Sequence, residues 1–90
     1  MEHDDKPRRE SGYLLETIEN ELLLYHPVET KVMYCNQTAS LIWQLCDGER
    51  TVQQIVDLLV EAYPEAAEEI ARDVRATLQQ FSDHGAIHFT

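Results

Sequence analysis

The sequence predicts a single α+β domain in which a three-stranded antiparallel sheet precedes three helices. Residues 13–35 contain three short runs of strand-forming residues, each bounded by turn-forming residues. Residues 37–84 instead carry apolar residues at helical spacing, interrupted where helix-ending residues occur. The two patterns meet at Asn36, a residue type that favours the start of a helix. Three strands followed by three helices in so short a chain are typical of a winged helix-turn-helix-like domain.

The three expected strands lie close together along the chain. Tyr13–Ile18 and Leu22–His26 are separated by Glu19–Glu21, whose central asparagine tolerates the positive φ of a tight hairpin turn. Pro27 ends the second strand because proline cannot donate to a sheet ladder. Lys31–Cys35 is the third strand, and it leads directly into the first helix.

The first two expected helices have clear start and stop signals. Asn36 is predicted to cap the first helix, Gln37–Cys46, and Gly48 to end it in a left-handed conformation. Thr51 precedes the second helix, Val52–Tyr63, and the glutamine three residues later completes a capping-box pattern. Both boundaries therefore follow from local sequence.

The third expected helix is the longest, Glu65–His84. Pro64 separates it from the second helix, and Gly85 ends it. Its apolar residues follow the spacing of one buried face: Ile70, Val74, Leu78 and Phe81. Ala86–Phe89 is expected to be short, apolar and extended.

Length and composition favour one small intracellular domain. The 90 residues suffice for a modest core, and we expect a mobile, charged tail at residues 1–11 before a domain at 12–90. The N-terminus lacks the apolar segment of a signal peptide, and no apolar run could span a membrane, so a cytoplasmic location is expected. Cys35 and Cys46 are accordingly expected to be reduced and buried.

The charge of the chain argues against nucleic acid as a partner. Seven Lys and Arg stand against seventeen Asp and Glu, giving a formal net charge of -10. Binding to phosphates needs clustered Lys and Arg, and an anionic membrane surface needs the same. A partner with a basic patch and a simply solvated acidic surface both fit this composition.

The sequence contains no pattern that indicates catalysis or cofactor binding. Cys35 and Cys46 form no metal-ligand spacing with the histidines, and the three glycines are too far apart for a phosphate loop. No serine or cysteine lies in a recognisable nucleophile motif. We therefore expect a protein that is not an enzyme, with no cofactor and no metal.

What remains is a surface for binding. An edge of a small sheet offers unpaired backbone donors and acceptors, which an extended peptide can use by adding a strand. Lys31–Cys35 could form such an edge beside the third helix. Alternatively, Val32, Met33 and Tyr34 fill the core, and periodicity alone favours that second interpretation.

The span Leu23–Ile87 resembles the PqqD family. The resemblance rests on Asn36–Leu59, which contains Asn-x-Thr-Ala and then Asp-Gly-x-x-Thr-Val-x-x-Ile, and on Ala62–Ala66 and Asp73–Ile87. It implies a non-catalytic recognition element for ribosomally synthesised, post-translationally modified peptides. Such a protein binds the leader part of a precursor peptide and presents it to a modifying enzyme, often a radical SAM/SPASM protein. Whether the pathway is that of pyrroloquinoline quinone or of another peptide stays open.

The resemblance also implies where the peptide binds. In that family the leader adds as a strand to the third strand, in the cleft against the third helix. The implied strand residues are Lys31, Val32, Met33, Tyr34 and Cys35. On the helix, both flanks of the buried face are candidates, comprising Ala71, Asp73, Val74, Arg75, Thr77 and Leu78. Which flank faces the strand stays open at this point.

Two other classes of function compete with leader-peptide binding. A winged-helix regulator would bind DNA, but the third helix carries Arg72 and Arg75 against five acidic residues. A small subunit that only stabilises a larger enzyme is the other alternative. We expect a monomer in dilute solution, with strand exchange at the open edge as a route to a dimer in crystals.

Overall fold

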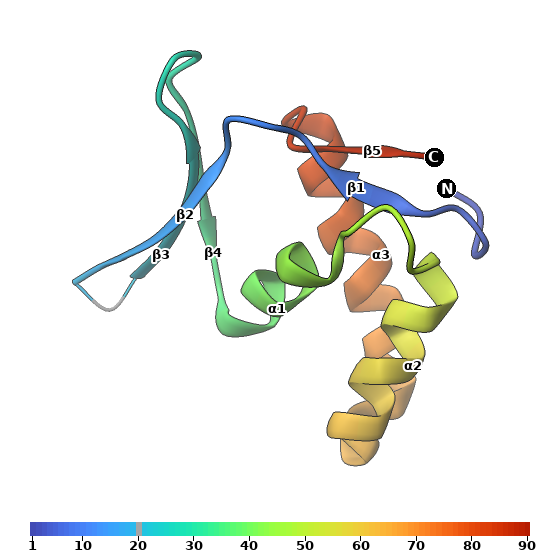
Figure 1. Cartoon of the computed structure of the whole chain (residues 1–90). Helices are drawn as coiled ribbons and strands as arrows, with labels where there is room; N and C mark the ends of the chain where they lie inside the picture. Colours follow the sequence, from blue (N-terminus) through green and yellow to red (C-terminus); the bar gives the residue numbers. More distant parts are fainter. Residues whose placement is uncertain (20) are drawn as a thin grey trace.

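The computed structural model describes residues 1–19 and 21–90, and it confirms the expected α+β order of elements. The strands and helices, in chain order, are β1 (Pro7–Arg9), β2 (Leu14–Ile18), β3 (Glu21–His26), β4 (Lys31–Cys35), α1 (Gln37–Leu45), α2 (Val52–Ala62), the short 3₁₀ helix η1 (Pro64–Ala66), α3 (Ala67–Asp83) and β5 (Ile87–Phe89). The sheet of β2, β3 and β4 stands beside the helices (Figure 1).

The three-stranded sheet is antiparallel in the order β2-β3-β4, so β4 is an edge strand. Its register joins Leu15, Leu24 and Met33 across the face that meets the helices. The hairpin between β2 and β3 turns at Glu19, whose φ is 51°. The role predicted for Asn20 in this turn lies outside the described residues.

The helix starts are capped by the side chains that the sequence indicates. The Asn36 side chain accepts a hydrogen bond from the Ala39 amide at 2.7 Å, which satisfies one of the free amides of α1. Thr51 and Gln54 form a reciprocal capping box at the start of α2. The third helix differs slightly from the prediction, because the residues after Pro64 first form a 3₁₀ turn and α3 begins at Ala67.

The core lies between the inner face of the sheet and the three helices. The Trp43 and Phe81 rings pack edge to face with centroids 5.6 Å apart, joining α1 to α3. Cys35 and Cys46 are both free and buried, as expected. Burial raises the pKa of Cys46 to about 12, so this thiol stays protonated. The principal buried residues of the helices are Ala39, Ile42, Trp43, Cys46, Val52, Ile55, Val56, Leu59, Ile70, Val74, Leu78 and Phe81.

The N-terminal segment differs from the mobile tail expected at residues 1–11. Pro7–Arg9 forms β1, which pairs antiparallel with β5, and Pro7 is fully buried. The carbonyl of Asp5 accepts the Val52 amide at 2.8 Å, so this segment also covers the start of α2. No sequence pattern indicated this strand, because β1 is short, charged and paired with the far end of the chain. Within the described residues, no helix is long and apolar enough to cross a membrane.

Candidate functional site

The side chains of β4 alternate between the core and solvent. Met33 and Cys35 are buried, whereas Val32 and Tyr34 are 53% and 71% exposed. The strand therefore presents one face to the helices and the other to solvent, as expected for a strand with a pleated backbone. Two of the five predicted strand residues, Met33 and Cys35, therefore fill the core.

The register of the sheet indicates which backbone groups of β4 are free. β2 and β3 pair up to their connection, where Glu21 belongs to the pair that closes the hairpin and exchanges hydrogen bonds. Bonding direction alternates along a strand, so Glu21 bonds toward β2 and Leu24 toward β4. Met33, opposite Leu24, then bonds inward. The amides and carbonyls of Val32 and Tyr34 consequently point to the open edge.

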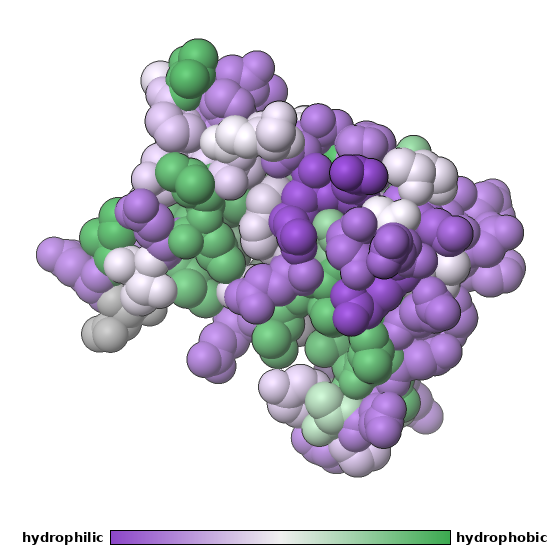
Figure 2. All heavy atoms as spheres, in the orientation of Figure 1, coloured by the Kyte–Doolittle hydropathy of each residue, from purple (hydrophilic) through white to green (hydrophobic). Residues whose placement is uncertain are grey.

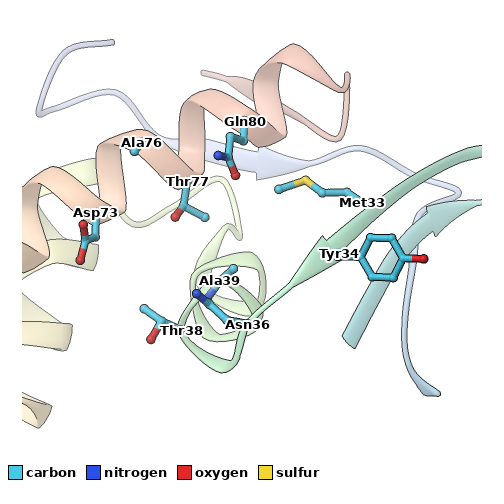
Figure 3. A pocket seen from close by; sticks show the side chains of 9 residues that line it. All are labelled: Met33, Tyr34, Asn36, Thr38, Ala39, Asp73, Ala76, Thr77 and Gln80. Carbon is cyan, nitrogen blue, oxygen red and sulfur yellow. The ribbon is translucent and has the colours of Figure 1, made fainter. Parts of the chain in front are cut away.

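A hollow of about 340 Å³ lies beside this edge, between β4, the start of α1 and one face of α3. Figure 3 shows Met33 pointing toward α3 and the Tyr34 ring turned away from it. Thr77 reaches from α3 toward the start of α1. The residues that line the hollow are Met33, Tyr34, Asn36, Thr38, Ala39, Asp73, Ala76, Thr77 and Gln80. An open strand edge thus has an adjoining space for side chains.

The structure shows which flank of α3 faces β4. Asp73 and Thr77 line the hollow. The side chain of Arg75 lies on the other flank, with a guanidinium nitrogen 3.4 Å from the carbonyl oxygen of Met1. Ala71 is exposed and does not line the hollow either. Members of both flanks were candidates from the sequence, and the packing of α3 against α1 separates them.

Two of the candidate residues on α3 do not form the wall of this hollow. Val74 and Leu78 are fully buried in the core. They hold α3 in place, and a peptide could reach Leu78 only if the core opened. Lys31, at the far end of β4, lies near the end of α3, with its ammonium 3.4 Å from the His84 carbonyl oxygen.

Several residues that line the hollow were not predicted from the sequence. Ala76 and Gln80 follow Asp73 at spacings of one and two helical turns, so the pattern of α3 could have suggested them once Asp73 was selected. Thr38 and Ala39 had no such signal. They join the site because α1 packs against α3, and that contact is not encoded in any local pattern.

The charge of the hollow is negative. Asp73 is the one charged residue among its lining residues, and within the described part of the chain no cation pairs with it. The hydroxyl and amide groups of Asn36, Thr77 and Gln80 supply neutral donors and acceptors. The wall opposite β4 is therefore polar and weakly acidic.

The outer face of the sheet is unusually apolar. Leu14, Ile18, Val32 and Tyr34 are all exposed large hydrophobic residues. Figure 2 shows hydrophobic atoms gathered over the strands, and further hydrophobic atoms among hydrophilic ones over the helices. A peptide added to β4 would extend this face.

The thiol of β4 and the acidic residues of the described chain bear on covalent and metal chemistry. Burial raises the pKa of the Cys35 thiol above its ordinary value, which opposes formation of a reactive thiolate. Among residues 1–19 and 21–90, no three His, Cys, Asp or Glu side chains come together as a metal-ion site. What the arrangement can do is pair a backbone and enclose side chains.

This winged-helix domain has an edge strand open to solvent and facing a helix across a hollow, which is the geometry used by proteins that bind an extended peptide as an added strand. The family model "Coenzyme PQQ synthesis protein D (PqqD)" matches residues 21–87, and the chain belongs to the PqqD family. The resemblance found in the sequence is thereby confirmed.

Similar proteins include the PqqA binding proteins of several bacteria. That of Rhodopseudomonas palustris strain TIE-1 is 44% identical over 55 residues, covering 61% of this chain and 54% of the relative. That of Bradyrhizobium diazoefficiens is 38% identical over 55 residues, covering 61% and 53%. The chain thus spans about half the length of the curated relatives it matches.

A solved structure supports the fold. The structure described as "TbiB1 in Complex with the TbiA(beta) Leader Peptide" superposes with a TM-score of 0.71 at 20% sequence identity. The match covers 90% of this chain and 94% of that one. At this level of identity the likeness shows the fold, including the arrangement of sheet and helices.

Proposed function

We propose that this protein is a non-catalytic peptide chaperone. It binds the leader region of a ribosomally synthesised precursor peptide and presents it to a modifying enzyme. The observation that carries the proposal is the open edge of β4, where Val32 and Tyr34 direct free backbone groups beside the hollow against α3. Ladder hydrogen bonds supply affinity in this mode, and the hollow receives alternate side chains of the peptide.

The comparisons support the choice of a precursor peptide as ligand. The relatives are named for binding PqqA, and the similar solved structure holds a leader peptide. By analogy, the proposed partner enzyme is a maturase such as a radical SAM/SPASM protein. The exposed apolar face of the sheet is a surface on which such an enzyme could dock.

Binding is tested by titrating the isotope-labelled protein with the leader half of the precursor peptide encoded beside its gene, and in parallel with PqqA. Amide shifts are expected to concentrate on Lys31–Cys35 and Asp73–Gln80. A scrambled peptide of equal composition is the control. Shifts confined to β2 and the outer side of α2 would place the site elsewhere and overturn the proposal.

Presentation is tested separately from binding. The maturase encoded in the same gene cluster is incubated with full-length precursor, with and without this protein, and product is followed by mass spectrometry. We expect faster modification in its presence and no gain when the leader is removed. Equal rates in both reactions would show that the protein binds the peptide but does not present it to the enzyme.

A further inference from the structure

A second hollow adjoins the first one along α3. It lies between the start of α1, the end of α2 and the first turns of α3, with a volume of about 310 Å³. Thr38 and Asp73 line both hollows, so the two share a boundary. In Figure 3 these two side chains mark the end of the first hollow that is remote from Met33.

The chemistry of the second hollow differs from that of the first. Its floor is apolar, because Leu59, Ile70 and Val74 are buried core residues that border it. Tyr63 is 44% exposed and adds an aromatic wall. Glu65 and Asp73 supply its charges, and among residues 1–19 and 21–90 no Lys, Arg or His lines either hollow. An apolar floor with an acidic rim suits an apolar side chain next to a cation.

We infer that the peptide groove continues past the end of β4 into this second hollow, and that Asp73 selects a basic residue in the peptide. The inference rests on the proposed function and adds the chemistry of the ligand to it. Along the groove, from β4 toward the second hollow, the peptide places its strand-pairing segment on β4, a Lys or Arg beside Asp73, and an apolar side chain in the second hollow. Asp73 is assigned this role because its side chain borders both hollows.

Two observations indicate that the peptide bound at β4 also occupies the second hollow: the two hollows are continuous, and their acidic residues attract a basic side chain. A strand that adds to β4 leaves the edge beside Asn36, next to the start of α1. The lining residues Thr38 and Asp73 then lie between it and the apolar floor. A peptide acid at the boundary would meet Asp73 and Glu65, with no cation among the lining residues that the structure describes, so acidic residues are disfavoured there.

The first experiment lets the protein choose its own ligand. A random peptide display library is selected against the wild-type protein, Asp73→Asn and Glu61→Gln. Glu61→Gln removes one negative charge on the opposite side of α2, where it borders neither hollow. We expect the wild-type and Glu61→Gln pools to enrich Lys or Arg at one position next to an apolar residue. The Asp73→Asn pool should lose the basic preference and keep the apolar residue.

The possible results separate the inference from the function on which it rests. A selected pool that shares apolar residues but has no basic position would overturn the role of Asp73. Such a pool would still support peptide binding by strand addition. A basic preference that survives in Asp73→Asn would do the same. No enrichment by the wild-type protein would contradict both.

The second experiment examines one enriched peptide by titration. Replacing its basic residue by norleucine should weaken binding by about two- to fivefold at low salt, and less at high salt, as for a partly exposed ion pair. Replacing its apolar residue by alanine should abolish amide shifts at Tyr63 and Ala66 while those of Lys31–Cys35 persist. Unchanged shifts at Tyr63 and Ala66 would show that the second hollow stays empty.

Discussion

The guanidinium of Arg9 donates hydrogen bonds to the carbonyl oxygens of Gln44 and Trp43, at 2.6 and 3.2 Å. These carbonyls lie in the last turn of α1, where intrahelical donors run out and the helix dipole is negative. A residue of β1 thereby completes the end of the helix whose first turn borders the groove. The N-terminal segment is consequently part of the scaffold of the site.

Arg9→Ala should lower the free energy of unfolding by about 1 kcal/mol, because two carbonyls lose a charged donor. Urea denaturation followed by circular dichroism measures this change. Arg8→Ala is the matched control, since the Arg8 side chain makes no hydrogen bond within the described residues. Equal effects of the two substitutions would contradict a capping role for Arg9.

Removing residues 1–9 should destabilise the domain by more than Arg9→Ala does. The deletion exposes the surface that Pro7 covers and leaves the amides of Val52 and Gln53 without the carbonyls of Asp5 and His3. Thermal unfolding of the shortened chain measures the effect. A melting temperature equal to that of the full chain would support the mobile tail expected from the sequence.

Proline substitutions along β4 should separate binding from folding. Tyr34→Pro removes an amide that points to the open edge, so peptide binding should fall at least tenfold while the fold survives. Met33→Pro removes an amide directed at β3, so it should unfold the sheet. Circular dichroism and peptide titration on both variants test this. A folded Met33→Pro protein that fails to bind would show that the amide of Met33, and not that of Tyr34, points to the open edge.

Two exposed alanines on α3 provide a steric test of the flank. Ala76 lines the hollow beside β4, whereas Ala71 does not. Ala76→Phe should therefore fill the hollow and weaken peptide binding about tenfold or more, and Ala71→Phe should leave binding unchanged. Calorimetric titration with the same leader peptide compares them. Equal affinities would exclude this hollow as the site of the peptide side chains.

The buried thiol of Cys46 predicts a pH dependence of stability. Burial raises its pKa from 9.0 to about 12, so below pH 9 it is protonated in both the folded and the unfolded state. Above pH 9 the unfolded state loses this proton and the folded state keeps it. The free energy of unfolding should then fall between pH 9 and 12, by up to about 1.4 kcal/mol per pH unit from this group.

Cys46→Ala provides the control for this pH dependence. The variant is less stable at neutral pH because it leaves a cavity, but its stability should fall less steeply above pH 9. Denaturant titrations at a series of pH values compare the two slopes. Parallel curves would mean that Cys46 titrates alike in both states.

Elements whose signals are local could be predicted from the sequence. The bounds of β4, Lys31–Cys35, agree with the prediction, and Asn36 and Thr51 cap the helices as expected. Capping and turn formation involve residues within one helical turn of each other, so short-range patterns are sufficient. The same motifs carried the resemblance to the PqqD family, which the comparison confirmed.

Only the packing of the elements shows which residues of α3 border the groove and that the two ends of the chain pair with each other. The helical period places Asp73 and Arg75 on different flanks of the buried stripe, but only the packing of α1 against α3 sends Asp73 toward β4. The pairing of β1 with β5 joins residues at opposite ends of the chain. Such contacts depend on how whole elements share one core, and no local pattern in a single sequence records that arrangement.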